Sequence, residues 1–135
     1  MQDQGVEKFN RNQLPHLTEE VIVQQFYPEI VNGEISLFYF NKKFAYACRK
    51  TPKKGEIRVQ EEFGGKITAY QPTQDELKWA EDILNYLPYR WLYARVDILP
   101  GKGLMELECI EPSLYFDVSP NGVHQMADAI SNISV

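Results

Sequence analysis

The sequence is poor in cysteine and has no long apolar run, and both scarcities narrow the class of protein. The chain has 135 residues and two cysteines, Cys48 and Cys109, which lie within apolar runs. We expect two buried free thiols in a reducing compartment, because a disulfide would require their strands to be neighbours. The polar start, MQDQGVEKFNRN, lacks the apolar core of a secretion signal, and no apolar stretch has membrane-spanning length. We therefore expect a cytoplasmic protein without a membrane partner.

An excess of basic residues is also missing. The chain has 14 lysines and arginines against 19 aspartates and glutamates, and its net charge is -5. Proteins that bind nucleic acid through its phosphates need a basic surface, so nucleic acid is not an expected partner. A local basic pocket is still compatible with this charge, and residues 49–54 form such a basic segment.

What the sequence does contain is enough apolar material for a folded domain. Hydrophobic residues make up 44% of the chain and aromatic residues 13%, which is typical of a globule with a packed core. The length fits one domain. We expect residues 1–20 to form an exposed lead-in segment and residues 21–135 to form the domain.

The first half of this domain has the pattern of successive strands. VIVQQFYPEI (21–30) predicts a buried strand that ends in a turn, and the Asn32-Gly33 pair predicts a further turn. EISLFYF (34–40) and FAYACRK (44–50) predict two more strands. Their short connection implies antiparallel pairing, because a parallel crossover needs many more residues. The next segment, 56–72, is predicted to be extended and irregular.

The second half predicts helices and another hairpin. Thr73 and Glu76 have the spacing of a capping box, which predicts a helix that Pro88 ends. Residues 91–100 and 104–111 predict two strands around a glycine-containing turn, and residues 121–133 predict a final helix. The fold class that follows is α+β, an antiparallel β-sheet with helices packed on one face.

Three carboxylates lie on the second hairpin, at Asp97, Glu106 and Glu108. Alternate residues of a strand share a face, so Glu106 and Glu108 point the same way and Asp97 can lie beside one of them. Carboxylates that gather at one place require a positive partner, and a hard divalent cation such as Mg²⁺ suits oxygen ligands. The alternative is an ordinary solvated acidic face.

Three cations lie near one predicted turn. Arg49 and Lys50 end a strand and Arg58 begins the next segment, so the three side chains could converge on one anion such as a phosphate. Gly64-Gly65 follows closely, and its backbone N–H groups could approach the same ligand. The alternatives are a solvated turn for the cations and a simple turn for the glycines.

The quoted runs together resemble a known family. VIVQQFYPEI, NGEISLFYF, the block RKTPKKGEIRVQEEFGG, and then YARVDIL and MELECIEPSL are similar to the C-terminal part of the ATP-grasp fold. The likeness is to its prokaryotic glutathione-synthetase-like and cyclo-ligase-like branch, and it extends from about Val21 to the final helix.

The resemblance implies roles for particular residues. It implies that Lys50 and Arg58 are catalytic cations that face phosphate or an acyl phosphate, and that Asp97, Glu106 and Glu108 bind Mg²⁺. The implied nucleotide-binding residues are Val23, Gln24 and Phe26 at the hinge to adenine, together with Arg49, Gly64, Gly65 and Ser113. Two positions depart from the family pattern. Glu108 stands where an asparagine is common, and Ser36 stands where some relatives carry a substrate-binding arginine, which argues against a glutathione-type substrate.

The implied chemistry is ATP- and Mg²⁺-dependent ligation of a carboxylate to an amine or a thiol. ATP would pass its γ-phosphoryl group to a small carboxylate substrate, and the nucleophile would then displace phosphate. ATP-grasp enzymes clasp the nucleotide between two subdomains, and the sequence has no counterpart of the N-terminal one. We therefore expect half of a site, little ligase activity from this chain alone, and either missing subdomains or self-association. The alternatives are a non-catalytic binding or oligomerisation module and a plain α+β interaction domain.

Overall fold

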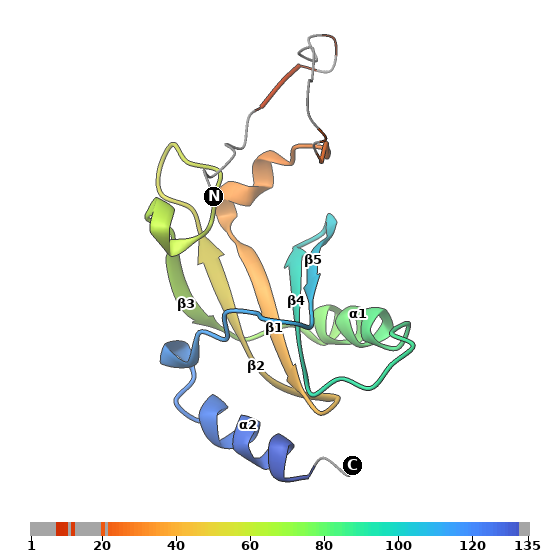
Figure 1. The fold of residues 1–135 in the computed structure, drawn as a ribbon. Helices are drawn as coiled ribbons and strands as arrows, with labels where there is room; N and C mark the ends of the chain where they lie inside the picture. The colour runs from red at the N-terminus through yellow and green to blue at the C-terminus, as the bar shows by residue number, and fades with distance from the viewer. Residues whose placement is uncertain (1–7, 11, 13–19, 21, 133–135) are drawn as a thin grey trace.

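One antiparallel sheet forms the centre of the molecule in the computed structural model, which describes residues 8–10, 12, 20 and 22–132. The sheet has five strands in the order β3-β2-β1-β4-β5 (Figure 1). The strands are β1 (Glu34–Phe40), β2 (Lys43–Thr51), β3 (Lys66–Tyr70), β4 (Tyr93–Leu99) and β5 (Gly103–Glu108), and the helices are α1 (Gln74–Leu84) and α2 (Gly122–Ser131). Short 3₁₀ turns cover Pro28–Asn32, Glu61–Phe63 and Phe116–Val118.

The two predicted hairpins are confirmed. β1 pairs with β2, and β4 pairs with β5, both antiparallel. The turn between β1 and β2 places Asn41 and Lys42 at positive φ, which suits a short connection between right-twisted strands. β1 also pairs with β4, so the two hairpins join into one sheet with β1 at its centre.

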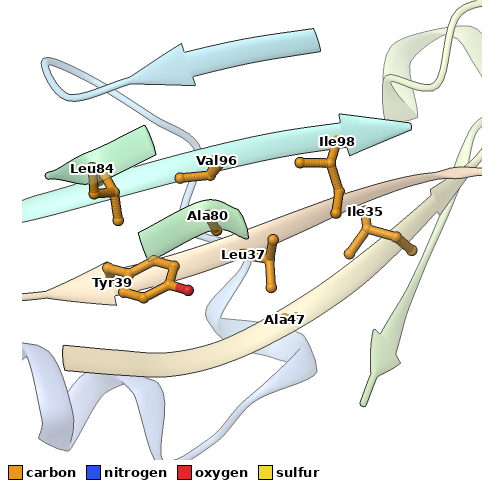
Figure 2. Close-up of a cluster of buried hydrophobic side chains, with 9 residues drawn as sticks. Ile35, Leu37, Tyr39, Ala47, Ala80, Leu84, Val96 and Ile98 are labelled. Carbon is orange, nitrogen blue, oxygen red and sulfur yellow. The ribbon is translucent and has the colours of Figure 1, made fainter. Parts of the chain in front are cut away.

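Helix α1 covers one face of the sheet with the main apolar core. Ile35, Leu37 and Tyr39 of β1 project from this face and meet Ala80 and Leu84 of α1 (Figure 2). The helix begins as predicted, because Thr73 accepts a hydrogen bond from the Glu76 backbone N–H and the Glu76 carboxylate accepts one from the Thr73 N–H. This capping box satisfies two backbone donors at the helix start.

Helix α2 packs against the opposite face. Phe38 and Phe40 of β1 project there, and Ala129 of α2 packs with them and with Tyr46 of β2. The predicted α+β class and antiparallel sheet are confirmed, whereas the placement of both helices on one face is not. The reason is that every residue of β1 is buried, so both faces of the central strand need a cover.

Two further details differ from the sequence-based expectations. The described part of the predicted strand 21–30, residues 22–30, contains no strand, and Ile22 is 95% exposed. Conversely, β3 arises within the segment expected to be irregular, where Ala69 pairs with Cys48 and Ile67 with Lys50. Most of the predicted lead-in segment 1–20 lies outside the described residues.

The two cysteines do not form a disulfide with each other. Cys48 and Cys109 are free, with Cys48 buried and Cys109 half-buried. Burial raises the pKa of the Cys48 thiol to about 11, which makes it unreactive at neutral pH. Within the described residues, no helix combines the length and the apolar character that crossing a membrane requires.

Candidate functional site

The α2 face of the sheet is divided into an apolar half and a charged half. The charged half comes from the strand register, which places Glu34 opposite Lys50 and Asp97 opposite Glu106. We use the name charged half-face for Glu34, Lys50, Arg95, Asp97 and Glu106. The predicted proximity of Asp97 to Glu106 is therefore confirmed at the level of strand pairing.

Lys50 is the buried cation of the charged half-face. Its Nζ lies 2.5 Å from the Glu34 carboxylate and 2.9 Å from the Asp97 carboxylate, and its side chain is only 6% exposed. Burial lowers the pKa of Lys50, but the charges of Asp97 and Glu34 outweigh this and raise it. Burial and the nearby charge of Asp97 together raise the pKa of Glu34 despite the opposing effect of Lys50. Lys50 therefore stays charged at neutral pH.

Arg95 is the second cation, and it joins two of the predicted metal ligands. Its Nε donates to both carboxylate oxygens of Asp97, at 3.1 and 3.0 Å, and its Nη2 lies 2.5 Å from a Glu106 oxygen. Asp97 is almost fully buried, whereas 55% of the Glu106 side chain is exposed. The pKa of Arg95 is raised because the carboxylates of Asp97 and Glu106 outweigh the effect of its burial.

A cleft of about 480 Å³ lies over the charged half-face. Its floor contains Glu34, Lys50 and Arg95. One wall is the loop 59–62, and the other is the segment that follows β5, with Ser113 and Tyr115 (the crossing segment). This crossing segment runs across the sheet from β5 towards the start of α2 (Figure 1). It is tied to β2 because Tyr46 donates a hydrogen bond to the Leu114 carbonyl.

The cleft is acidic on balance, and this bears on what it can bind. Four glutamates line it against one lysine and one arginine, and Asp97 lies beneath them. A free polyanion would be repelled by this excess of carboxylates, whereas a divalent cation, or an anion that carries one, would be attracted. Magnesium therefore fits the site in ligand type and in charge. As the side chains stand in the described part of the chain, no three acidic, histidine or cysteine side chains form a ready metal cage.

Of the three predicted phosphate-facing cations, Lys50 alone lines the cleft. Arg49 is next to Lys50 on β2 and points to the other face, where it lies over the Tyr70 ring and donates to the Asn32 carbonyl. Arg58 lies in the loop after β2, holds the Glu56 carboxylate at 2.7 Å and stacks over Phe63. The three cations therefore do not converge in this structure.

The predicted glycines and hinge residues also lie apart from the cleft lining. At Gly65 an added Cβ would overlap the Val59 carbonyl, so this glycine allows the loop to approach its own backbone. Gly64 has φ +80 and ends the 3₁₀ turn that precedes it. Val23 is 65% exposed and Gln24 is exposed, whereas Phe26 packs beside Ile30 and Leu99.

Glu108 and Ser113 are the remaining predicted site residues. Glu108 pairs with Arg95 across the two strands, and its carboxylate accepts a hydrogen bond from the Ile110 N–H, which lowers its pKa. Ser113 lines the cleft. Ser36, at the position of the family's arginine, is fully buried and lies opposite both Cys48 and Asp97.

Three residues of the site escaped the sequence-based prediction. Glu34 could have been found from the short turn at 41–43, because such a turn sets a register that places Glu34 opposite Lys50. Arg95 could have been found from its alternation with Asp97, which puts both on one strand face. Tyr115 has no comparable signal, because it lies in an irregular segment at positive φ.

Comparisons with known proteins identify the family and support the fold. Residues 1–125 match the family "Prokaryotic glutathione synthetase, ATP-grasp domain". A comparison with curated protein sequences gave no match. Among solved structures, the chain is similar to D-cycloserine synthetase, with a TM-score of 0.66 and 23% identity over 80% of this chain and 40% of that one. The chain thus spans less than half the length of that protein, and the likeness concerns the fold. From the family match, the chain belongs to the ATP-grasp domains of the prokaryotic glutathione synthetase family.

Proposed function

We propose that this chain supplies half of the active site of an ATP- and Mg²⁺-dependent ligase that joins a carboxylate to an amine or a thiol. The observation that carries the proposal is the charged half-face. In a chain of this family, Lys50, Asp97 and Glu106 meet beneath one cleft. The hydrophobic core does not need these charges, because burying them costs desolvation energy that apolar side chains would avoid.

The metal would be held by the carboxylates of Asp97, Glu106 and Glu108. Mg²⁺ prefers oxygen ligands, and these three side chains lie on facing strands at one side of the sheet. Bound Mg²⁺-ATP supplies a γ-phosphoryl group that activates the carboxylate substrate as an acyl phosphate, from which the nucleophile displaces phosphate. The exposed Glu106 is the side chain with the greatest freedom to adjust to the ion.

The cations would bind and orient the anionic groups. Lys50 is fixed from two sides by Glu34 and Asp97, so its charge is held in place before any ligand arrives. Arg58 is attached to the neighbouring loop, and we propose that it meets phosphate as this loop closes over the cleft. Gly64, Gly65 and Ser113 remain our predicted nucleotide contacts, and Val23, Gln24 and Phe26 our predicted hinge to adenine. Arg49 points to the face opposite the cleft, so we no longer include it among the nucleotide contacts.

The carboxylate substrate would differ from that of a glutathione-forming enzyme. Ser36 is short and fully buried opposite Asp97, so it offers no cation to a second carboxylate. The rest of the substrate site would come from other subdomains, since the neighbour of known structure is more than twice as long as the matched part. We therefore expect little or no ligase activity from the 135 residues alone.

Calorimetric titration of Mg²⁺-ATP tests the proposal. The chain should bind Mg²⁺-ATP weakly, and the Asp97→Asn/Glu106→Gln double variant should lose the binding. Asp75→Asn/Glu81→Gln is a matched control, because both residues lie on the exposed side of α1, away from the cleft. If the double variant binds as well as the parent chain, the carboxylates do not form the site. If a longer protein that includes the missing subdomains also fails to bind, the ligase proposal is wrong.

A non-catalytic binding or oligomerisation module is the second candidate, and exposed apolar side chains favour it. Val123 and Ile130 lie on the outer side of α2, at 52% and 55% exposure. Met126 and Ala129 pack on the sheet instead. Exposed apolar surface of this kind promotes association. Sedimentation analysis at high concentration should then show dimers, and Val123→Lys/Ile130→Lys should restore the monomer; a parent chain that stays monomeric excludes self-association.

A further inference from the structure

The guanidinium of Arg95 occupies the carboxylate oxygens that a metal ion would use. It reaches both oxygens of Asp97 through Nε and one oxygen of Glu106 through Nη2. The second Asp97 oxygen also accepts from Lys50. Asp97 therefore has each of its oxygens engaged by a cation, and 99% of its surface is shielded from solvent.

A divalent ion and this guanidinium cannot share these oxygens. Mg²⁺ binds oxygen at about 2.1 Å with nearly ideal octahedral geometry. An ion at that distance from Asp97 and Glu106 would lie within a few ångströms of Arg95 as it stands, and two positive centres so close repel strongly where water is scarce.

The Arg95 side chain has free space beside it into which it can move. It lines the cleft, so its side chain can turn into the cleft without crossing the core. Glu106 can follow a metal ion because its side chain is half-exposed and lies on an edge strand. By contrast, Lys50 is fixed by both Glu34 and Asp97.

We propose that Arg95 is a built-in competitor of the metal, so that a divalent cation binds Asp97 and Glu106 only by displacing the Arg95 guanidinium. This rests on the proposed function of the same site. Its consequence is a coupling in both directions, in which metal binding releases Arg95 into the cleft and any group that draws Arg95 away strengthens metal binding.

The experiment is a titration of the 135-residue chain with MgCl₂ at constant ionic strength, followed by two-dimensional NMR. The signals to follow are the Arg95 Nε–H and the backbone amides of Asp97 and Glu106. We expect the Arg95 signal to shift with the same midpoint as the amides. Arg95→Ala should bind MgCl₂ at least about tenfold more tightly, because it leaves a buried carboxylate short of a partner.

Three variants make the result decisive. Arg95→Lys keeps a cation but loses the forked donor, so it should bind Mg²⁺ with intermediate affinity and also serves if Arg95→Ala does not fold. Arg90→Ala removes an exposed arginine of the same segment and should leave the midpoint unchanged. Glu106→Gln should weaken binding, which shows that the ion is at this site.

The possible outcomes separate the two proposals. If the parent chain binds Mg²⁺ and the Arg95 variants bind equally or more weakly, the competitor proposal is wrong and the metal site stands. If the parent chain does not bind Mg²⁺ but an Arg95 variant does, the result supports the proposal, because Arg95 then blocks the metal site completely. If neither binds, the competitor proposal is wrong, and the metal half-site is decided separately by the Mg²⁺-ATP titration of the longer protein.

Discussion

The two faces of β1 carry different kinds of side chain, although they belong to one seven-residue strand. Towards α1 the strand presents Ile35, Leu37 and Tyr39, which are all apolar or aromatic and pack into one core. Towards α2 it presents Phe38 and Phe40 at one end but Glu34 and Ser36 at the other. Both faces are buried to a similar degree, so burial alone does not explain the difference.

This difference between the two faces separates the side chains that stabilise the fold from those that we assign to binding. An apolar face gains free energy from each methylene that leaves water, about 0.8 kcal/mol apiece. A buried ion pair gains little, because the desolvation of two charges offsets their attraction. The charged half-face is therefore a poor way to stabilise a sheet, which is why we assign it to binding.

Removing Lys50 should have the largest effect on stability. Lys50→Met leaves the Glu34 and Asp97 carboxylates buried with one cation fewer, and such a break costs about 3–5 kcal/mol. Urea unfolding measures this loss. Lys78→Met is the matched control, because Lys78 forms a solvent-exposed pair with Asp82 and should cost no more than about 1 kcal/mol. Equal losses in the two variants would contradict the account of the buried pair.

Truncation on the other face should be nearly as costly but should act by a different route. Leu37→Ala removes a fully buried side chain from the α1 core and should destabilise the chain by about 2–5 kcal/mol. Leu104→Ala, on an exposed position of β5, should change the free energy of unfolding by less than about 0.5 kcal/mol. A loss at Leu37 no larger than at Leu104 would show that this face is not the main core.

A methyl group at Gly65 should disturb the wall of the cleft. Its Cβ would overlap the Val59 carbonyl, so Gly65→Ala must shift the loop that carries Glu61 and Glu62, at about 1–3 kcal/mol. Gly103→Ala has open space around it and should be nearly neutral. Thermal unfolding compares the two. If Gly65→Ala left the unfolding temperature unchanged, the loop would not be held against its own backbone.

Acid should weaken the surface pair between Glu56 and Arg58 by a small amount. Hydrogen bonds from Arg58 lower the pKa of Glu56 to about 2. A lowered carboxylate pKa contributes stability that is present above the unfolded pKa, near 4.5, and is lost as the pH falls towards 2. The parent chain should thus be more stable than Glu56→Gln above pH 5, and the gap should shrink in acid. A gap that widens on acidification would contradict this sign.

The sequence predicted those parts of the fold that local patterns determine. Alternation and short turns gave both hairpins, and the Thr73–Glu76 spacing gave the start of α1. The segment 22–30 was mistaken for a strand because its apolar residues suggest burial, yet no strand of the sheet pairs with it in the described part. β3 was missed because the irregular segment 52–65 separates it from its partner β2, so no short turn marks the pairing.

The site was predicted only in part, because only some of its residues lie in local sequence patterns. Asp97, Glu106 and Lys50 have local signals, because charges that alternate with apolar residues on strands stand out. The partners that neutralise them, Glu34 and Arg95, have weaker signals, in the register of a hairpin and in the alternation along a strand. Their role in the site emerges only when the sheet order brings β2, β1, β4 and β5 side by side. The expected convergence of Arg49 and Arg58 on Lys50 overlooked that Arg49 and Lys50 are adjacent in a strand and so point to opposite faces.

Two neighbouring residues of β5 allow the most direct test of the central contrast. Glu106 faces the cleft, whereas Leu107 packs on the α1 core. Mg²⁺-ATP binding and urea unfolding should be measured on Glu106→Gln and Leu107→Ala under conditions where both variants are folded. We predict that Glu106→Gln loses binding and keeps its stability, and that Leu107→Ala loses stability and keeps its binding. Two variants that lose stability together, with unchanged binding in Glu106→Gln, would contradict the division of the sheet into a stabilising face and a binding face.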